Sequence, residues 1–480
     1  MRRTKIICTI GPVVHSPAAL EQLLASGMDV ARLNFSHGTH AEHAQAIEWL
    51  RAASERAGKA VAIIGDLQGP KIRTGNNRNA EPIELKSGQR LIITTDPVEG
   101  TAERISTTYP HFAEDVHPGD RILLDDGQLE LQVLSTDGVR QVVTEVVLGG
   151  TLGSHKGINM PGVNLRAEAI TAKDREDLEF ALQAGVDYVA LSFVRRPEDV
   201  VQARQLMERA GYAVPLIAKI EKPEALANLD AILDVTDGVM VARGDLGVEL
   251  TPEQVPVVQK DIVHRCNRRG LPVIIATQML NSMIEHPRPT RAEASDVANA
   301  TFDCADAVML SGETASGRYP IAAVQMMDRI VRAAEAQMAK QQPKVPLQPT
   351  TLPAAFPEVT CNIACRAAQE AGATLIVAFT MSGLTARLLS HFRPNVPVLA
   401  FSPVQAVRRR TALLWGVLPR LMEPLSTTEE MVKRVEEDLL SGGLARPGDR
   451  IVVVLGAPVG SGSPTNSIRL HQLPLSPPLS

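Results

Sequence analysis

Eight short apolar runs recur through the first two thirds of the chain, and they limit the folds that it can adopt. Each run is continuous rather than alternating, which is typical of strands buried on both faces of a parallel sheet. Most runs are followed by a segment with helical periodicity, such as Pro17–Ser26 or Lys173–Ala184. Eight strands that alternate with helices predict an α/β fold with a closed (β/α)8 barrel. The predicted strands are Ile6–Ile10, Val30–Asn34, Val61–Gly65, Tyr188–Ser192, Leu216–Ile220, Gly238–Ala242, Val273–Ala276 and Ala307–Leu310.

The alternation of strands and helices is interrupted after the third strand and again near residue 340. The first interruption has alternating apolar runs and turn signals, which predict an inserted β-barrel domain that acts as a lid over the catalytic face. The second is rich in proline and glutamine and predicts a linker. Beyond it, we expect a helix at Val359–Ala371, strands in TLIVAFT and VPVLAFS, and a closing strand in RIVVVLG. The predicted domains are the barrel (1–69 and 169–340), the β lid (70–168), the linker (341–357) and a C-terminal α/β domain (358–480).

Composition argues against several kinds of partner. The net charge of -5 does not favour a nucleic acid or an anionic membrane, because both attract basic surfaces. No run approaches the roughly 18–20 apolar residues that a membrane-spanning helix needs. The five cysteines are scattered and form no CxxC pair, which is typical of a reduced, cytoplasmic compartment.

Polar side chains follow nearly every predicted strand. In barrels of this type, the catalytic groups lie at the carboxyl ends of the strands. Buried charges cost several kcal/mol unless they are paired or used, so this rim is the predicted active site. The rim residues are Arg32, Asn34, Asp66, Ser192, Lys219, Glu221, Arg243, Asp245, Thr277, Ser311 and Glu313.

Two acids and three bases of this region suggest its chemistry. Glu221 and Asp245 follow neighbouring strands, and two carboxylates with little nitrogen or sulfur nearby suit a hard cation such as magnesium or manganese. Lys219 points to the same side of its strand as Glu221, and a simple structural ion pair between the two is the alternative. Arg32, Arg73 and Lys219 together suit a phosphoryl group. There is no GxxxxGK[ST] loop, so any nucleotide is bound in another way.

Two further charged clusters have simpler interpretations. His37, His40 and His43 lie at helical spacing, and the first and last are about 120° apart around a helix, which disfavours a shared metal. The run Arg408–Arg410 is interpreted as a solvated helix face.

Several long motifs resemble those of pyruvate kinases. In order, they are RLNFSHG, GDLQGPKIRTG, SHKGIN, AKIEKPEAL, MVARGDLGVEL, PVIIATQMLNSM, PRPTRAEASDVANA and MLSGETASGRYP. The resemblance covers nearly the whole chain and implies a barrel, an inserted lid and a C-terminal effector domain. It implies phosphoryl transfer from phosphoenolpyruvate to ADP in glycolysis, by a cytoplasmic homotetramer. Two alternative functions remain. One is that of another barrel enzyme that uses phosphoenolpyruvate or pyruvate (a lyase or aldolase), and the other is that of a catalytically inactive regulatory protein with this fold.

The resemblance also implies roles for individual residues of the phosphate and nucleotide sites. Arg32 and Arg73 are similar in position to the family's phosphate contacts, with the nucleotide contacts alongside them. Lys156 resembles the lid lysine that reaches ATP. The implied nucleotide-binding residues are Asn34, Ser36, His37, Arg73 and Lys156.

On the substrate side, Lys219 resembles the residue that neutralises the negative charge of the phosphoryl group during transfer and of the enolate that this transfer produces. Glu221 and Asp245 resemble the magnesium ligands, and the amides of Gly244 and Asp245 resemble a cradle for the substrate carboxylate. Thr277 is similar to the residue near the carbon that is protonated. The proton comes either from Thr277 or from a chain of water molecules.

Two regulatory features follow from the same resemblance. The family's potassium site corresponds to Asn34, Ser36, Asp66 and Leu67, but this chain departs from the usual pattern there. Lys71 stands where potassium-dependent relatives carry glutamate, so we expect its ammonium group to replace the ion; the alternative is a hinge lysine that points to water. The effector loop corresponds to Thr380, Ser382, Gly383 and Thr385 and is expected to hold a phosphate of a sugar phosphate or AMP, with a plain helix N-cap as the alternative.

Overall fold

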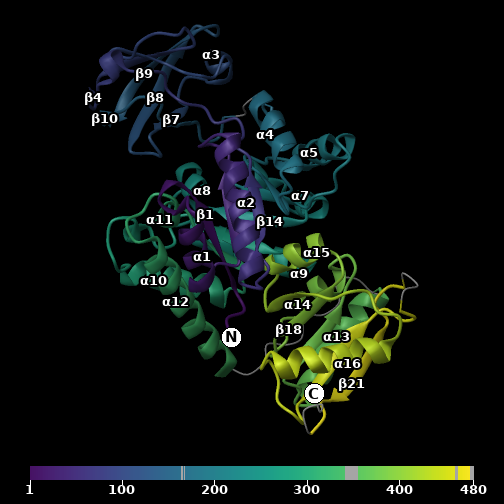
Figure 1. The fold of residues 1–480 in the computed structure, drawn as a ribbon. Helices are drawn as coiled ribbons and strands as arrows, with labels where there is room; N and C mark the ends of the chain where they lie inside the picture. The colour runs from purple at the N-terminus through teal and green to yellow at the C-terminus, as the bar shows by residue number, and fades with distance from the viewer. Residues whose placement is uncertain (164–165, 167, 341–354, 460–462, 476–480) are drawn as a thin grey trace.

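The computed structural model describes residues 1–163, 166, 168–340, 355–459 and 463–475. They form three folded parts, with the barrel in the centre, the lid at one end and the C-terminal domain at the other (Figure 1). Residues 341–354 of the predicted linker lie outside the described residues. None of the helices within these ranges is long and apolar enough to cross a membrane.

The central sheet closes into a barrel of eight parallel strands in the order β1-β16-β15-β14-β13-β12-β3-β2. The predicted barrel is therefore confirmed, and every strand boundary lies within one residue of the prediction. The prediction works because strands buried on both faces are continuous apolar runs. The strands are β1 (Lys5–Ile10), β2 (Val30–Asn34), β3 (Ala62–Asp66), β12 (Tyr188–Leu191), β13 (Leu216–Ile220), β14 (Gly238–Ala242), β15 (Val273–Ala276) and β16 (Ala307–Leu310).

Helices surround the barrel (Figure 1). Three of them, α2, α4 and α10, begin with a capping box in which a threonine and an acid three residues later satisfy each other's backbone amides. The main helices are α1 (Pro17–Ser26), α2 (His40–Arg56), α4 (Ala172–Gln183), α5 (Pro197–Arg209), α7 (Leu229–Val235), α9 (Val255–Arg269), α10 (Arg291–Phe302) and α12 (Pro320–Lys340), and the short α8 spans Arg243–Glu249.

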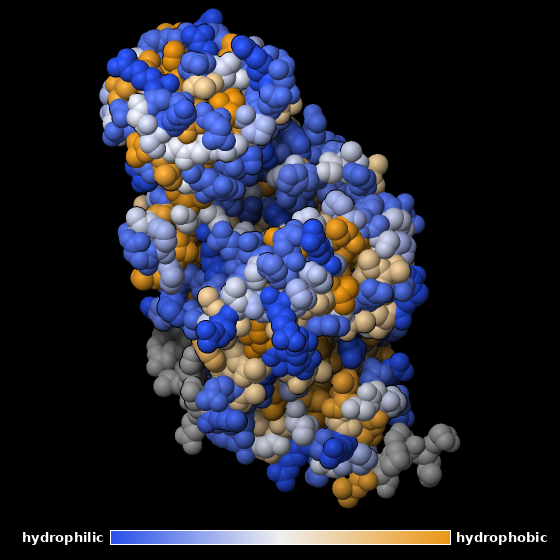
Figure 2. All heavy atoms as spheres, turned by 90° about the vertical axis from the view of Figure 1, so that its left-hand side faces the viewer, coloured by the Kyte–Doolittle hydropathy of each residue, from blue (hydrophilic) through white to orange (hydrophobic). Residues whose placement is uncertain are grey.

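The lid has a hydrophobic core of its own, separate from that of the barrel. Its main sheet has the strand order β11-β7-β8-β9-β5-β6, and β10 pairs with β4 beside it. On the face shown in Figure 2, a hollow lined mainly by hydrophilic atoms separates the lid from the barrel. The strands are β4 (Ile83–Leu85), β5 (Arg90–Thr94), β6 (Arg104–Ser106), β7 (Arg121–Leu124), β8 (Leu129–Thr136), β9 (Gln141–Leu148), β10 (Gly150–Leu152) and β11 (Ile158–Asn159).

The C-terminal domain is a five-stranded sheet in the order β19-β18-β17-β20-β21, with helices packed on it. The expected closing strand is β20, which instead lies inside the sheet, because the antiparallel β21 follows it and forms the edge. The helix α13 begins three residues before the predicted start. The elements are α13 (Phe356–Glu370), β17 (Leu375–Phe379), α14 (Leu384–His391), β18 (Val398–Ser402), α15 (Gln405–Arg410), β19 (Val417–Leu421), α16 (Thr428–Ser441), β20 (Arg450–Leu455) and β21 (Ser467–Gln472).

Helix α15 packs against the end of the barrel that lies opposite the predicted active site. Arg409 Nε lies 2.9 Å from Asp187 Oδ1, just before β12, and Arg408 donates to the carbonyl of Gly58 at 3.3 Å. Arg408 is only 9% exposed. The interpretation of Arg408–Arg410 as a solvated face is therefore wrong, because the barrel covers this face of the helix.

Candidate active site

A compact group of charges lies at the carboxyl ends of β2, β3 and β13. Asp66 is fully buried; its Oδ2 accepts from Arg32 Nε at 2.6 Å, and its Oδ1 lies 3.3 Å from Lys219 Nζ. Lys219 also donates to Ser192 Oγ at 2.7 Å and lies 2.9 Å from Glu221 Oε1. The parallel register brings these residues, far apart in the sequence, to one rim of the barrel.

The protonation of this group follows from its mutual contacts. Burial alone would lower the pKa of Lys219, but Asp66 and Glu221 outweigh it and raise that pKa above its usual value. Burial likewise opposes ionisation of Asp66, yet Lys219 and Arg32 hold its pKa below the usual range. Lys219 is therefore protonated, and the neighbouring carboxylate of Asp66 is ionised.

Glu221 and Asp245 present the second pair of charges. Burial raises the pKa of Glu221; Lys219 opposes the shift and the nearby Asp245 carboxylate adds to it. Glu221 Oε2 accepts the backbone N–H of Phe193 at 2.8 Å. Two nearby carboxylates that repel each other, one buried and one partly exposed, fit a divalent cation with oxygen ligands. Across the described ranges, no three His, Cys, Asp or Glu residues form a complete metal site, so substrate and water oxygens would supply the other ligands.

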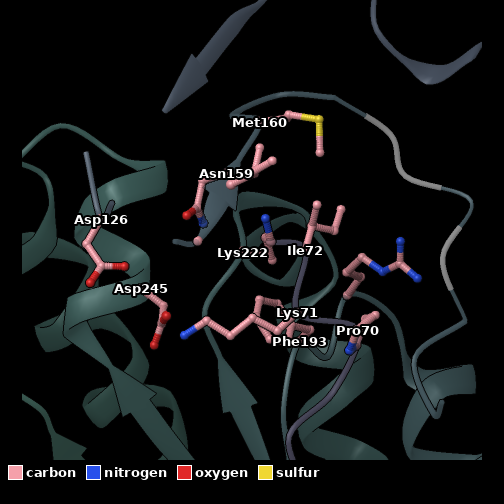
Figure 3. Close-up of a pocket in the computed structure, with 12 residues that line it drawn as sticks. Pro70, Lys71, Ile72, Asp126, Asn159, Met160, Phe193, Lys222 and Asp245 are labelled. Carbon is pink, nitrogen blue, oxygen red and sulfur yellow. The ribbon is translucent and has the colours of Figure 1, made fainter. Parts of the chain in front are cut away.

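A pocket lies between the lid and the barrel rim (Figure 3). Lys71, from the entry into the lid, extends across it toward Asp245. Asp126 and Asn159 line the pocket from the lid, and Lys222 lines it from the barrel. The pocket therefore combines residues of both domains around the predicted metal ligand Asp245.

The predicted phosphate and nucleotide residues gather on the β2 side of the rim. The pKa of His37 is lowered, first by burial and then by the positive charges of Arg73, Lys71 and Arg32, so these four groups lie together. Arg73 donates to the carbonyl of His155 at 3.0 Å. This cluster of cations is suited to bind phosphate oxygens.

Lys156 lies in the lid, where its Nζ is 2.9 Å from Asp125 Oδ1. Its backbone N–H and C=O both bond to Thr74, so the lysine is fixed to the segment that leads into the lid. In this structure the Lys156 ammonium is thus paired with a carboxylate of the lid itself.

The predicted carboxylate cradle begins at the first turn of α8. The N–H of Gly244 donates to Thr277 Oγ1 at 2.7 Å, and the Thr277 hydroxyl donates to the carbonyl of Ala276 at 2.6 Å. Thr277 has a φ of 67°, a conformation that costs energy for a β-branched residue. Such strain is typical of functional sites, and the two hydrogen bonds of the hydroxyl help to maintain this conformation.

The residues that correspond to a potassium site have hydrogen-bond or ionic partners within the protein. Asn34 Oδ1 accepts the N–H of Ser36 at 3.2 Å, and the carbonyl of Leu67 accepts the hydroxyl of Ser192 at 2.6 Å. Both carboxylate oxygens of Asp66 already contact cationic side chains.

Some rim residues have structural roles instead. Arg243 forms an ion pair with Asp296 at 2.6 Å and donates to the carbonyl of Thr277. Glu313 accepts the backbone N–H groups of Leu280 and Ser311, at 3.0 and 2.7 Å. These charges shape the loops around the site.

The three histidines of the HGTHAEH motif make separate contacts. His40 Nε2 lies 2.7 Å from Asp177 Oδ1, and His43 Nε2 contacts the carbonyl of His37 at 2.9 Å. The rings of His40 and His43 thus contact different partners, a carboxylate and a backbone carbonyl.

The predicted effector loop connects β17 to α14. Gly383 adopts a φ of 90°, and its N–H donates to Thr380 Oγ1 at 2.9 Å, while the N–H of Leu384 contacts Ser382 Oγ at 3.4 Å. The Thr385 hydroxyl bonds to Thr465 at 2.7 Å. The loop is a tight turn of hydroxyls and amides at the start of an eight-residue helix.

Sequence reasoning missed a second layer of residues around the metal carboxylates. Glu249 accepts from Lys222 and from Asn159 Nδ2, the latter at 3.0 Å. Phe193, whose N–H contacts Glu221, has a φ of 56°. The pattern of each segment alone carries no signal for these contacts, because the partners are as many as 90 residues apart.

Comparisons with known proteins agree with this geometry. The family described as "Pyruvate kinase, barrel domain" matches residues 1–324, and "Pyruvate kinase, alpha/beta domain" matches residues 358–471. The pyruvate kinase of Corynebacterium glutamicum is 48% identical, and the alignment covers 98% of both chains. That of Geobacillus stearothermophilus is 46% identical over 98% of this chain and 80% of its own. The solved structure of a pyruvate kinase from Cryptosporidium parvum has a TM-score of 0.90 and 38% identity, over 98% of this chain and 96% of that one.

Proposed function

Because this chain belongs to the pyruvate kinase family, we propose specific roles for the residues of its barrel rim in phosphoryl transfer. The enzyme is a phosphotransferase of glycolysis that converts phosphoenolpyruvate and ADP to pyruvate and ATP. The contact of Lys219 with both Asp66 and Glu221 supports the assignment most directly, since it places a permanent cation between two carboxylates at the rim.

Lys219, Arg32 and Arg73 neutralise the phosphoryl group. Phosphoryl transfer spreads negative charge over three oxygens and needs positioned cations more than covalent help. Asp66 holds both Arg32 and Lys219 in place, so the two cations are oriented before the substrate arrives. After transfer, Lys219 faces the enolate oxygen that remains.

Glu221 and Asp245 hold the divalent cation. The family is generally magnesium-dependent, and the two converging carboxylates with oxygen donors fit magnesium or manganese. When bound, the ion would supply positive charge to phosphoryl and enolate oxygens. This role also explains why the buried Glu221 lies near a second carboxylate, that of the partly exposed Asp245.

The substrate carboxylate is assigned to the first turn of α8. The amides of Gly244 and Asp245 point from a helix start, where anions are favoured. Thr277 contacts the Gly244 amide and lies beside this cradle, which suits a hydroxyl near the carbon that receives the proton.

The nucleotide lies between the rim and the lid. Asn34, Ser36, His37 and Arg73 form the barrel side of this site, and Lys156 forms the lid side. The ion pair of Lys156 with Asp125 has to open for the lysine to reach a phosphate, so nucleotide binding exchanges one anionic partner for another.

The Lys71 ammonium takes the place of a monovalent cation, which makes the enzyme independent of potassium. In support, Lys71 shares a pocket with Asp245 and is among the cations that lower the pKa of His37. A tethered charge supplies the same electrostatic stabilisation without binding an ion from solution.

In the C-terminal domain, Thr380, Ser382, Gly383 and Thr385 bind the phosphate of a sugar phosphate or AMP effector. The hydroxyls and the positive-φ glycine of this turn support the assignment. The enzyme acts as a cytoplasmic homotetramer, as the family resemblance implies.

A coupled assay tests the proposed roles. Pyruvate formation from phosphoenolpyruvate should require both ADP and magnesium, and Glu221→Gln should lower the turnover by orders of magnitude in a folded protein. A lyase or aldolase would consume substrate without ADP. Full activity of Glu221→Gln at low magnesium would exclude its role as a metal ligand.

A further inference from the structure

Glu249 joins three parts of the active-site region. It is the last residue of α8, and its carboxylate side chain is 1% exposed. One oxygen, Oε1, accepts from the ammonium of Lys222 and from Asn159 Nδ2 at 3.0 Å. Lys222 follows β13 in the barrel, and Asn159 ends β11 in the lid. A single buried oxygen therefore contacts both domains.

The ion pair connects the segments that carry the proposed metal ligands. Lys222 is adjacent to Glu221 in the sequence, and Glu249 lies one helical turn after Asp245 on α8. A contact between Lys222 and Glu249 therefore fixes the end of β13 relative to α8. Such a restraint is needed because the carboxylates of Glu221 and Asp245 repel each other when no cation lies between them.

Lys222 is also connected to Glu221 through Phe193. The ammonium of Lys222 lies 5.8 Å from the ring centroid of Phe193, whose N–H donates to Glu221. The ring also packs on Gly69, where an added Cβ would lie 2.7 Å from it. Gly69 immediately precedes the entry into the lid at Pro70. The positive φ of Phe193 is costly for a bulky residue, so its neighbours must hold it in place.

We propose that Glu249 is a positioning residue for the metal carboxylates. Through Lys222 it sets the separation of Glu221 and Asp245, and through Asn159 it ties that separation to the position of the lid. The inference rests on the proposed metal site formed by Glu221 and Asp245. It implies a reciprocal linkage: a bound cation restrains the lid, and a restrained lid favours the cation.

Binding of Mn²⁺ to the full-length enzyme tests whether Glu249, through Lys222, positions the metal carboxylates. Free Mn²⁺ is measured by electron paramagnetic resonance, with thermal melts to confirm that each variant is folded. Glu249→Gln and Lys222→Met should each weaken binding about tenfold, as outer partners of metal ligands do. The double variant should be no weaker than either single one, because the pair acts as a unit. Glu253→Gln, on the exposed loop that follows α8, is the matched control and should bind as the wild type does.

The same titration separates this inference from the proposed metal site. Wild-type Mn²⁺ affinity in both Glu249→Gln and Lys222→Met, together with lost affinity in Glu221→Gln, would overturn the positioning role alone. Wild-type affinity in Glu221→Gln would overturn the metal site on which the inference rests.

Hydrogen exchange tests whether the contact of Asn159 with Glu249 couples the metal site to the lid. In the wild type, Mn²⁺ should slow amide exchange in residues 69–73, where the chain enters the lid, and in residues 156–159, the lid segment that carries Asn159. In Asn159→Ala, Mn²⁺ should bind more weakly than in the wild type but more tightly than in Glu249→Gln, since only the contribution of the lid is lost and Glu249 keeps Lys222, and exchange at these segments should no longer slow. Equal slowing in Asn159→Ala and in the wild type would show that the lid is not coupled through this contact.

Discussion

Lys219 Nζ lies 2.9 Å from Glu221 Oε1, so the cation assigned to the phosphoryl group contacts a carboxylate assigned to the metal. The two residues are separated by only one position on β13 and its end, and both are buried. Each charge therefore stabilises the other. Removing either one leaves a buried charge without its partner, which is costly.

The first prediction concerns Lys219. Replacement by methionine preserves much of the volume but removes the cation, so kcat should fall by about 10³-fold or more. Steady-state kinetics of pyruvate formation measure the effect, with Lys433→Met on the exposed face of α16 as the matched control. A folded Lys219→Met enzyme with a near-normal rate would contradict the assignment.

A second prediction concerns Lys71. If its ammonium replaces a monovalent cation, the wild type should work fully in buffer that contains tetramethylammonium instead of sodium and potassium. Lys71→Glu should lose at least about tenfold in kcat/KM, equivalent to about 1.4 kcal/mol, and added potassium should restore part of it. Lys86→Glu, an exposed lid variant with the same charge change, should match the wild type. A wild-type rate that rises many-fold on addition of potassium would refute the idea.

For the effector loop, we expect Ser382→Asp to abolish activation. The introduced carboxylate repels a phosphate at the turn of Thr380 and Gly383, whereas the distant barrel site is unchanged. Activity is measured with and without a sugar phosphate or AMP, and the rate without ligand should stay within about twofold. Ser441→Asp, exposed on α16, serves as control. Unaltered activation in Ser382→Asp would place the effector elsewhere.

Stability should depend on pH through His391, at the seam between α14 and the barrel. Burial, with the nearby Arg393 adding to it, lowers the pKa of His391 to about 4, and its Nε2 is buried without a partner among the described residues. The unfolded chain binds a proton near pH 6.5 but the folded one does not. Stability is therefore present above pH 6.5 and is lost as the pH falls toward 4.

Between pH 7 and pH 5, this loss should amount to about 2 kcal/mol at most. The fluorescence of Trp415, which lies on the same seam beside Arg393, follows denaturation by urea at each pH. His391→Gln should remove that part of the pH dependence, whereas His264→Gln on the exposed face of α9 should retain it. The same pH slope in both variants would rule out His391 as the cause.

The barrel was predictable because its strands are buried on both faces and are therefore continuous apolar runs. The strand-end rule located Lys219, Glu221, Asp66 and Arg32 correctly on one rim. A purely local pattern cannot reveal burial that comes from another domain, and for this reason the three arginines of α15 were interpreted wrongly. The contact of Asn159 with Glu249 was missed for the same reason, since it joins two domains.

The pairing of β1 with β16 has a consequence for how the chain is made. Lys5 lies in register with Ala307. The barrel therefore cannot close until β16, its last strand, has been synthesised and can pair with β1, its first. The strands of the lid pair only with each other and have their own core, and all of them precede β12. The lid is thus expected to fold first during synthesis, while β1 and β3 each still lack a neighbouring strand on one side. That interval is the stage at which nascent chains need protection by chaperones.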